Sequence, residues 1–151
     1  MSDDSLDRLL DLVNRLRGLD PASPRRAWLA ALEARVEQFS RASCRLAVYG
    51  TLAPRGVNHG LIGGMPGTWA RGAVRGIRFV VDRGPARGCP GLRLDPAADL
   101  VAVWVLESPF LPSRWWRIDA FEGPAYRRVL TRVDIAAGVQ VVANVYVVEP
   151  E

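Results

Sequence analysis

The spacing of apolar residues changes at residue 44, and this change constrains the fold more than any other feature of the sequence. Before residue 44, apolar residues recur every three or four positions, which is typical of amphipathic helices. After it, they form short runs or alternate with polar residues, which is typical of strands. We therefore expect a two-helix extension over residues 1–43 and a mainly β domain over residues 44–151.

The N-terminal part predicts two helices. The first has acidic residues in its first turn, Arg15 and Arg17 in its last turn, and Gly18 as its stop. The second begins with Ser23 as N-cap and Pro24 at the first helical position. The apolar stripes are expected to hold Leu6, Leu9, Leu10, Val13 and Leu16 in the first helix, and Trp28, Leu32, Val36 and Phe39 in the second. Both stripes are narrow, so we expect a helical hairpin that completes the core, and a homodimer through these stripes stays open.

The second part predicts short strands with one intervening helix. Strands are expected over 44–49, 74–81 and 100–106, the last buried on both faces, then a helix over 111–121 and a β-hairpin formed by 126–135 and 139–148. Residues 82–91 read as a loop rich in Gly, Pro and Arg. This order favours an α+β domain whose sheet curls towards a small barrel.

The length and charge of the chain bound its class. A chain of 151 residues buries about two thirds of its surface, which supports one core. The net charge is +4, and all 20 basic residues are arginines, six of them between Arg71 and Arg93 with a single acid. We interpret this stretch first as a solvated strand face with a loop, second as an anion-attracting rim of a pocket, and only third as a nucleic-acid surface, because no aromatic platform or groove-reading helix accompanies it.

Membrane and metal roles are not indicated. No apolar run is long enough to span a bilayer, and the first residues are acidic where a signal peptide would be basic, so we expect a cytoplasmic protein without a membrane partner. Cys44 and Cys89 are far apart and have one histidine for company, which indicates neither a zinc site nor a disulfide framework.

A first candidate site is the tetrapeptide Tyr49-Gly50-Thr51-Leu52 at the end of an expected strand. Glycine permits a sharp turn there, and successive backbone N–H groups in such a turn can converge on an anion or a developing oxyanion. The alternative is a simple turn, which is the commoner role of such a segment.

A second candidate is Glu122, at the end of the helix expected over 111–121. The helix dipole disfavours a carboxylate there, and its neighbour Phe121 is apolar. Both effects raise the pKa of a carboxyl group, which is how a glutamate becomes a useful base near neutral pH. The alternative is an exposed glutamate at a helix end.

Three further candidates carry weaker signals. His59 lies in a Gly-rich loop with no residue spaced to form a triad. Asp119 lies three residues before Glu122 on the same helical face, but a surface or capping role is favoured for it. Trp115 and Trp116 could stack on a planar ligand, although adjacent helical residues point in different directions and at least one is expected in the core.

Taken together, an ordered series of short motifs gives a more specific signal. It comprises Tyr49-Gly50-Thr51-Leu52, Arg55-Gly56-Val57-Asn58-His59, Gly76-Ile77-Arg78-Phe79, Gly88-Cys89-Pro90-Gly91-Leu92, Ile118-Asp119-Ala120-Phe121-Glu122-Gly123, Tyr126-Arg127-Arg128 and Ala143-Asn144-Val145-Tyr146. Over residues 44–149 this series resembles the γ-glutamylcyclotransferase family, in its AIG2-like branch. The chain departs from the family pattern at Cys89, where an aromatic residue is frequent, and at Ala102, where glycine is frequent.

The resemblance implies a small mixed β-barrel with flanking helices, here preceded by the N-terminal helical hairpin. It also implies an enzyme that releases 5-oxoproline from γ-glutamyl-amino acids or γ-glutamylamines, with no cofactor and no metal. The resemblance makes Glu122 the general base, and it assigns binding of the glutamyl part to Tyr49, Gly50, Thr51 and Leu52. Tyr126 becomes a pocket residue with Arg128 beside it in a supporting role. The alternative is a non-catalytic binding module for a small anionic, glutamyl-like metabolite.

Overall fold

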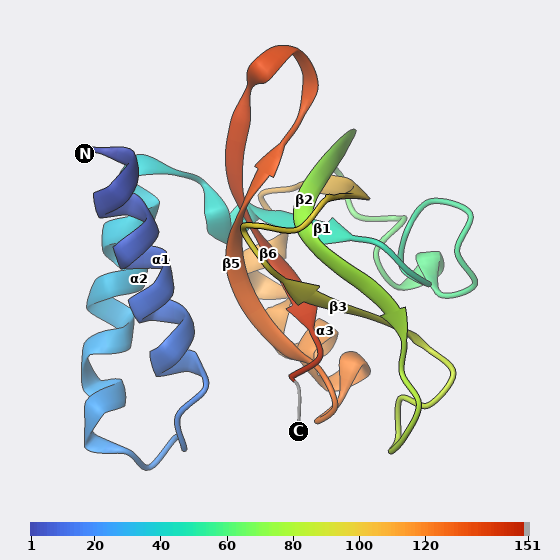
Figure 1. Cartoon of the computed structure of the whole chain (residues 1–151), viewed down its shortest axis with the longest axis horizontal. Helices are drawn as coiled ribbons and strands as arrows, with labels where there is room; N and C mark the ends of the chain where they lie inside the picture. Colours follow the sequence, from blue (N-terminus) through green and yellow to red (C-terminus); the bar gives the residue numbers. More distant parts are fainter. Residues whose placement is uncertain (150–151) are drawn as a thin grey trace.

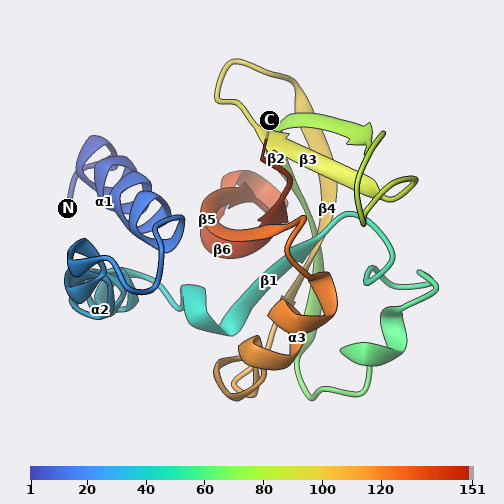
Figure 2. The same ribbon diagram turned by 90° about the horizontal axis from the view of Figure 1, so that it is seen from below.

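The computed structural model describes residues 1–149, and it shows a helical hairpin beside a closed β-barrel (Figure 1). The hairpin comprises α1 (Asp3–Arg17), a 3₁₀ turn (Pro24–Trp28) and α2 (Leu29–Phe39). The barrel comprises β1 (Arg45–Val48), β2 (Thr68–Val80), β4 (Leu100–Glu107), β5 (Arg127–Asp134) and β6 (Gln140–Val147), with β3 (Pro90–Leu94) added to β2. The helix α3 (Trp115–Glu122) follows a 3₁₀ turn (Leu111–Ser113) and lies beside β1 (Figure 2).

The barrel is mixed, as expected. Its strand order is β2-β4-β1-β6-β5, and β2 closes it by pairing with β5 at Ala73 and Asp134. The β1–β6 pair is parallel, and the other pairs are antiparallel. The closure demands a small residue at position 72, because a Cβ on Gly72 would lie 2.9 Å from the carbonyl oxygen of Asp134.

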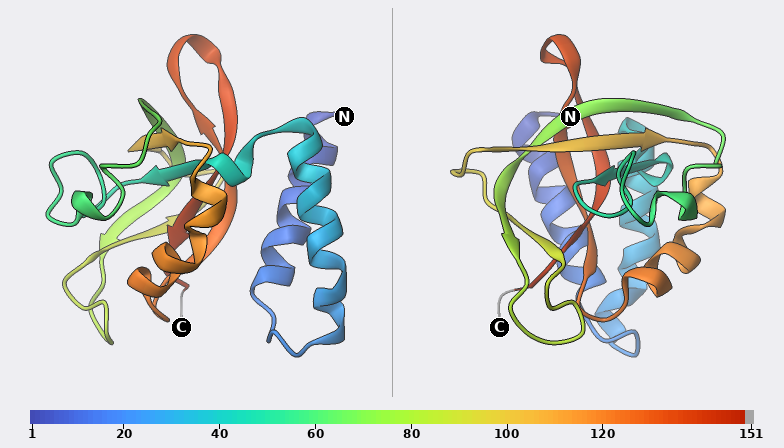
Figure 3. Two further views of the ribbon diagram at one scale, coloured as in Figure 1. Left: turned by 180° about the vertical axis from the view of Figure 1, so that it is seen from behind. Right: turned by 90° about the vertical axis from the view of Figure 1, so that its right-hand side faces the viewer.

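β2 is the longest strand and takes part in two pairings. Its first eight residues pair with β4 and its last five with β3, so that the strand curves along the barrel wall (Figure 3). The strand predicted over 74–81 is therefore too short, because Arg71 and Gly72 interrupt the apolar pattern while their backbones continue the ladder. β3 lies partly inside the predicted loop and was missed, because Pro90 and Gly91 at its start are weak strand formers.

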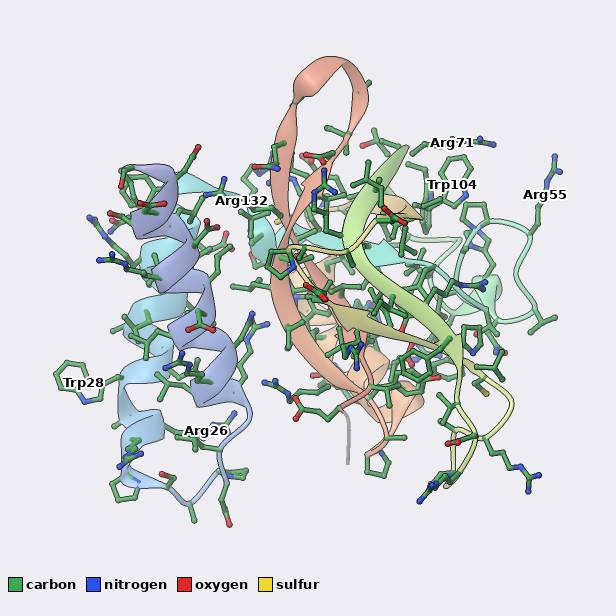
Figure 4. All side chains as sticks on the ribbon, viewed as in Figure 1. Arg26, Trp28, Arg55, Arg71, Trp104 and Arg132 are labelled. Atoms are coloured by element: carbon green, nitrogen blue, oxygen red, sulfur yellow. The ribbon has the colours of Figure 1, made fainter. Side chains whose placement is uncertain are left out.

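The N-terminal hairpin begins and ends close to the predicted positions, but its second apolar stripe is wrong in part. Val36 is buried, whereas Trp28 is 70% exposed and Phe39 48% exposed. The 3₁₀ turn before α2 changes the rotation per residue, so Trp28 does not continue the stripe of the α-helix. Figure 4 shows Trp28 pointing away from the barrel.

The hairpin packs on the outer side of β5 and β6. The apolar residues buried at this contact are Leu10, Val13, Val36, Ala42, Leu130 and Val142. Asn14 adds two polar contacts, since its Nδ2 donates to the carbonyl oxygen of Leu130 at 2.8 Å and its Oδ1 accepts from the N–H of Leu130 at 2.7 Å. Where β5 has no neighbouring strand, a side chain of α1 thus completes its hydrogen bonding.

The strand predicted to be buried on both faces, β4, is buried mainly in its second half. Leu100 is 51% exposed, whereas Val103, Val105 and Leu106 are buried. No helix among residues 1–149 is long and apolar enough to cross a membrane.

Candidate active site

A cavity of about 370 Å³ opens where β1 ends, next to the C-terminal end of α3. Four segments line it: the turn after β1, the loop before β3, the connection from α3 to β5, and β6. The lining residues are Ala47, Val48, Tyr49, Gly50, Thr51, Leu52, Asn58, Pro85, Ala86, Cys89, Pro90, Phe121, Glu122, Gly123, Pro124, Ala125, Tyr126 and Tyr146. The structure therefore brings Glu122, residues 49–52 and Tyr126 to one cavity, although they are up to 77 positions apart in the chain.

The turn after β1 lines this cavity and holds unpaired backbone donors. Its shape is held by two hydrogen bonds, from the N–H of Ala53 to the carbonyl oxygen of Gly50 at 3.0 Å and from the N–H of Asn58 to that of Thr51 at 2.9 Å. Among the described residues, none accepts a hydrogen bond from the N–H groups of residues 50–52. Three consecutive unpaired donors are therefore available to an anionic or carbonyl oxygen.

Glu122 is the last residue of α3 and lies in a partly buried position. Burial raises the pKa of its carboxyl group to about 7, and repulsion by the carboxylate of Asp119 adds to the effect. Gly123 ends the helix with φ +74° and ψ −175°, a conformation that glycine alone adopts readily, and it turns the chain directly from Glu122 towards Tyr126.

The three tyrosines of the chain all line the cavity. The hydroxyl of Tyr49 donates to the carbonyl oxygen of Tyr146 at 2.7 Å, and that of Tyr126 donates to the carbonyl oxygen of Pro90 at 2.7 Å. Burial raises the pKa of Tyr126 to about 12 and also raises that of Tyr49. Both phenols therefore stay neutral near pH 7, and their hydroxyl groups tie together the segments that form the cavity walls.

Asp119 occupies the centre of a polar cluster behind the cavity. Its Oδ1 accepts from the hydroxyl of Tyr146 at 2.6 Å and from Nε of Arg128 at 2.9 Å, and its Oδ2 accepts from the same guanidinium at 3.3 Å. Arg128 also lies over the ring of Trp115, 4.4 Å from the ring centre. Arg128 binds Asp119 but is not among the residues that line the cavity, and its supporting role stays a prediction.

The roles of Asp119 and Tyr146 were missed by the sequence reasoning. The i, i+3 spacing of Asp119 and Glu122 was the available signal, and it correctly placed both carboxyl groups on one helical face. What it lacked was the contact with Arg128 and Tyr146, which neighbouring strands β5 and β6 supply.

The weaker candidates have structural contacts outside the cavity. Nδ1 of His59 lies 2.9 Å from the carbonyl oxygen of Leu52, and its ring packs 5.3 Å from that of Trp69. Trp115 is buried and donates to the carbonyl oxygen of Ser43 at 2.9 Å, while Trp116 is 71% exposed. Within residues 1–149, no three His, Cys, Asp or Glu side chains gather where they could hold a metal ion.

The arginine-rich stretch from 71 to 93 is dispersed over several elements. Arg71 lies over the ring of Trp104 at 4.9 Å on the outer side of β2 and β4, where Figure 4 labels both residues. Arg78 donates to the carbonyl oxygen of Tyr49 at 3.2 Å, close to the turn that lines the cavity. One arginine of the stretch thus stands near the cavity, and another faces away from it.

Comparison with known proteins identifies a family. A family model described as "Gamma-glutamyl cyclotransferase, AIG2-like" matches residues 46–151, which is most of the chain. No curated protein matches the sequence significantly.

Solved structures share the barrel. An AIG2-like protein from Mus musculus is 25% identical with a TM-score of 0.51, and the match covers 69% of this chain and 76% of that one. The protein YkqA from Bacillus subtilis is 22% identical with a TM-score of 0.56, covering 70% of this chain and 36% of that one. A protein from Arabidopsis thaliana is 18% identical with a TM-score of 0.53, covering 69% of this chain and 67% of that one. The latter two similarities show the fold alone.

Proposed function

The chain belongs to the AIG2-like γ-glutamyl cyclotransferase family, and from this premise we propose that it releases 5-oxoproline from a γ-glutamyl-amino acid or γ-glutamylamine. One observation carries the proposal. The carboxyl group whose pKa is raised to about 7, that of Glu122, lines the same cavity as three unpaired backbone N–H groups, those of residues 50–52. A base and an oxyanion site facing one cavity are what an acyl transfer without a covalent intermediate requires.

The reaction is a ring closure within the substrate. The α-amine nitrogen attacks the γ-carbonyl carbon, a new C–N bond forms, and the bond from that carbon to the leaving amine breaks. Such an intramolecular attack can reach effective molarities of order 10⁵ M or more when the two groups are held close together. The protein has to hold the substrate folded, move protons and stabilise the oxyanion.

Glu122 is suited to move the protons. The α-ammonium group loses two of its three protons as it becomes the lactam nitrogen, and the leaving nitrogen gains two as it departs as an ammonium group. A carboxylate that twice accepts a proton from the first nitrogen and passes it to the second completes this exchange. The resting state of Glu122 is regenerated, so the cycle needs no external acid or base.

The raised pKa brings the base close to its proton donor. Proton transfer from an α-ammonium group to a carboxylate is uphill, and it becomes less so as the pKa of the carboxyl group rises. The pKa of Glu122 is raised from 4.5 to about 7, a difference of roughly 2.5 units. The burial of Glu122 thus lowers the cost of forming the nucleophile by roughly 3 kcal/mol.

The turn after β1 is suited to the developing negative charge. When the α-amine attacks, the γ-carbonyl oxygen becomes an oxyanion, to which the unpaired N–H groups of this cavity-lining turn can donate. The remaining donors of the turn can hold the α-carboxylate of the glutamyl part. We therefore assign the glutamyl subsite to residues 49–52, with Tyr126 as a wall of the pocket.

A substrate panel tests the proposal. The full chain is incubated with γ-glutamyl-amino acids and γ-glutamylamines, and 5-oxoproline is measured by mass spectrometry. We expect release from at least one member, and loss of at least a hundredfold in Glu122→Gln. Glu37→Gln is the matched control, because it makes the same change at an exposed glutamate of α2 outside the cavity, and it should keep full activity.

Failure of this test has a defined meaning. No 5-oxoproline from any substrate, or equal release by Glu122→Gln, would refute the assignment. Calorimetric binding of a glutamyl compound without turnover would instead favour the non-catalytic binding module.

A further inference from the structure

The outer face of β6 connects the N-terminal hairpin to the candidate active site. Side chains alternate along a strand, so Val142, Asn144 and Tyr146 share one face. Val142 packs against the hairpin, and Tyr146 lines the cavity. Asn144 lies between them and is fully buried, which makes its hydrogen bonds the polar connection between the two regions.

Asn144 is bound by two arginines from opposite sides. Its Oδ1 accepts from Nη1 of Arg17 at 2.8 Å and from Nη1 of Arg128 at 3.0 Å, and its Nδ2 donates to the carbonyl oxygen of Ala42 at 2.8 Å. Arg17 comes from the last turn of α1, and Arg128 comes from β5. A buried amide oxygen that accepts from both guanidinium groups fixes their positions relative to each other.

Each arginine has its own carboxylate. Nε of Arg17 donates to Glu33 of α2 at 2.9 Å, and Arg128 donates to Asp119 through two nitrogens. Burial lowers the pKa of Arg17, and repulsion by the positive charge of Arg128 lowers it further. The two cations therefore still repel each other. The arrangement is therefore held by the hydrogen bonds of Asn144 and by the two carboxylates, and it would relax if one member were removed.

We propose that Arg17 is a positioning residue of the candidate active site: through Asn144 it fixes the Arg128–Asp119 pair behind Glu122, so that the N-terminal hairpin takes part in the acid–base chemistry. The proposal rests on the proposed function for its catalytic meaning, but its physical content can be measured without substrate. It gives the N-terminal hairpin a role that the family match, which begins at residue 46, does not cover.

The charges around Glu122 define the direction in which its pKa should change when Arg17 is replaced. Asp119 is on the same helix and repels the carboxylate of Glu122. The phenols of Tyr49, Tyr126 and Tyr146 face Glu122 from the turn after β1, the connection before β5, and β6, and they are neutral near pH 7. Cys89, in the loop before β3, also lines the cavity.

Two cations stand behind Asp119. Arg128 binds Asp119 directly, and Arg17 lies beyond it on the far side of Asn144. Loss of the positive charge at Arg17 would leave Asp119 less compensated and more strongly repelling. The pKa of Glu122 should then rise further.

The test follows the ionisation of Glu122 directly. The full chain is labelled with ¹³C at the glutamate carboxyl groups, and the Glu122 signal is titrated by NMR in the wild type and in Arg17→Gln. We expect its midpoint to move upward by about 0.3 pH unit or more in the variant. Arg17→Lys keeps the charge but loses the fork that reaches Glu33 and Asn144 together, and we expect a smaller upward displacement.

Arg132→Gln is the matched control. Arg132 also joins β5 to α1, through Asp7 at 2.7 Å, but it does not touch Asn144, and Figure 4 shows it between the hairpin and the barrel. The titration midpoint of Glu122 in the Arg132→Gln variant should match that of the wild type. Thermal unfolding should confirm that all variants are folded.

Two results would overturn the proposal. One is an unchanged Glu122 midpoint in folded Arg17→Gln or, if that variant does not fold, in folded Arg17→Lys. The other is an equal displacement in Arg132→Gln, because the effect would then follow docking of the hairpin in general. Since no substrate is present, either result is independent of whether 5-oxoproline is released.

Discussion

Glu122 carries its carboxyl group in surroundings that oppose ionisation. Burial and the nearby charge of Asp119 together raise its pKa to about 7. Such a group weakens the folded state whenever it is ionised, since the unfolded chain would ionise it freely. The cost is acceptable where the group is needed as a base, which agrees with the proposed role.

This cost predicts how stability depends on pH. Because the folded-state pKa of Glu122 lies above its unfolded value, its contribution to stability is fully present below about pH 4.5 and is lost as the pH rises through about 7. At pH 8, Glu122→Gln should therefore unfold at a higher urea concentration than the wild type, because its free energy of unfolding is higher by roughly 2 kcal/mol. This difference in free energy should shrink towards pH 5. A variant that is less stable than the wild type at pH 8 would contradict the burial of this carboxyl group.

Cavity residues were predictable from the sequence where they stand at the end of a helix or strand next to glycine. Glu122 stands at a helix end before glycine, and residues 49–52 stand at a strand end with glycine. Asp119 was a weaker candidate with a surface or capping role favoured. Its contacts with Arg128 and Tyr146 were not predicted, because those residues lie 9 and 27 positions away and arrive through the pairing of β5 with β6. The spacing of residues within one helix does not show which side chains of neighbouring strands will contact that helix.

At the scale of elements, the junction from α3 to β5 sets the direction of Glu122. Gly123 combines a positive φ with an extended ψ, and a Cβ there would meet no atom within 4 Å. The expected cost of a side chain is thus backbone strain alone. This backbone conformation between α3 and β5 is one that glycine adopts without strain.

Gly123→Ala should lower the free energy of unfolding by about 1–3 kcal/mol, because alanine rarely adopts this conformation. The measurement is urea unfolding followed by circular dichroism. Gly60→Ala is the control, since its Cβ would also meet open space and its φ is not in the positive range, and it should change stability by less than about 0.5 kcal/mol. Equal effects at both positions would show that strain at Gly123 is not the cause.

Strand boundaries were less predictable than strand existence. β1, β5 and β6 follow apolar runs and alternation, and they lie within two residues of their expected bounds. The strand predicted over 74–81 was too short, because Arg71 and Gly72 interrupt the apolar pattern within β2. β3 was missed, because Pro90 and Gly91 at its start are weak strand formers. Backbone pairing with a neighbour decided these elements over local preference.

At the scale of the whole molecule, the N-terminal hairpin completes the barrel. Asn14 pairs with both backbone groups of Leu130 on β5, and the apolar contact beneath it buries Leu130 and Val142. The division into 1–43 and 44–151 remains a prediction about chain organisation. The two parts nevertheless share one apolar contact and several polar contacts.

Asn14→Ala should destabilise the protein by roughly 2–3 kcal/mol, because it leaves the N–H and the carbonyl oxygen of Leu130 without partners. Asp11→Ala is the control on the same helix, where an exposed ion pair with Arg15 is worth less than about 0.5 kcal/mol. Thermal and urea unfolding of both variants measure the difference. If Asn14→Ala proved as stable as Asp11→Ala, the hairpin would not complete the edge of β5.

The most direct test of the central claim is the pH dependence of 5-oxoproline release by the full chain. With the best substrate of the panel, kcat/KM should rise with pH and reach half its maximum near pH 7, where Glu122 ionises. Glu122→Gln should lose at least a hundredfold of this rate and the ascending limb with it. A wild-type profile that is flat between pH 5 and 8, or a Glu122→Gln variant that keeps both the rate and the limb, would contradict the account.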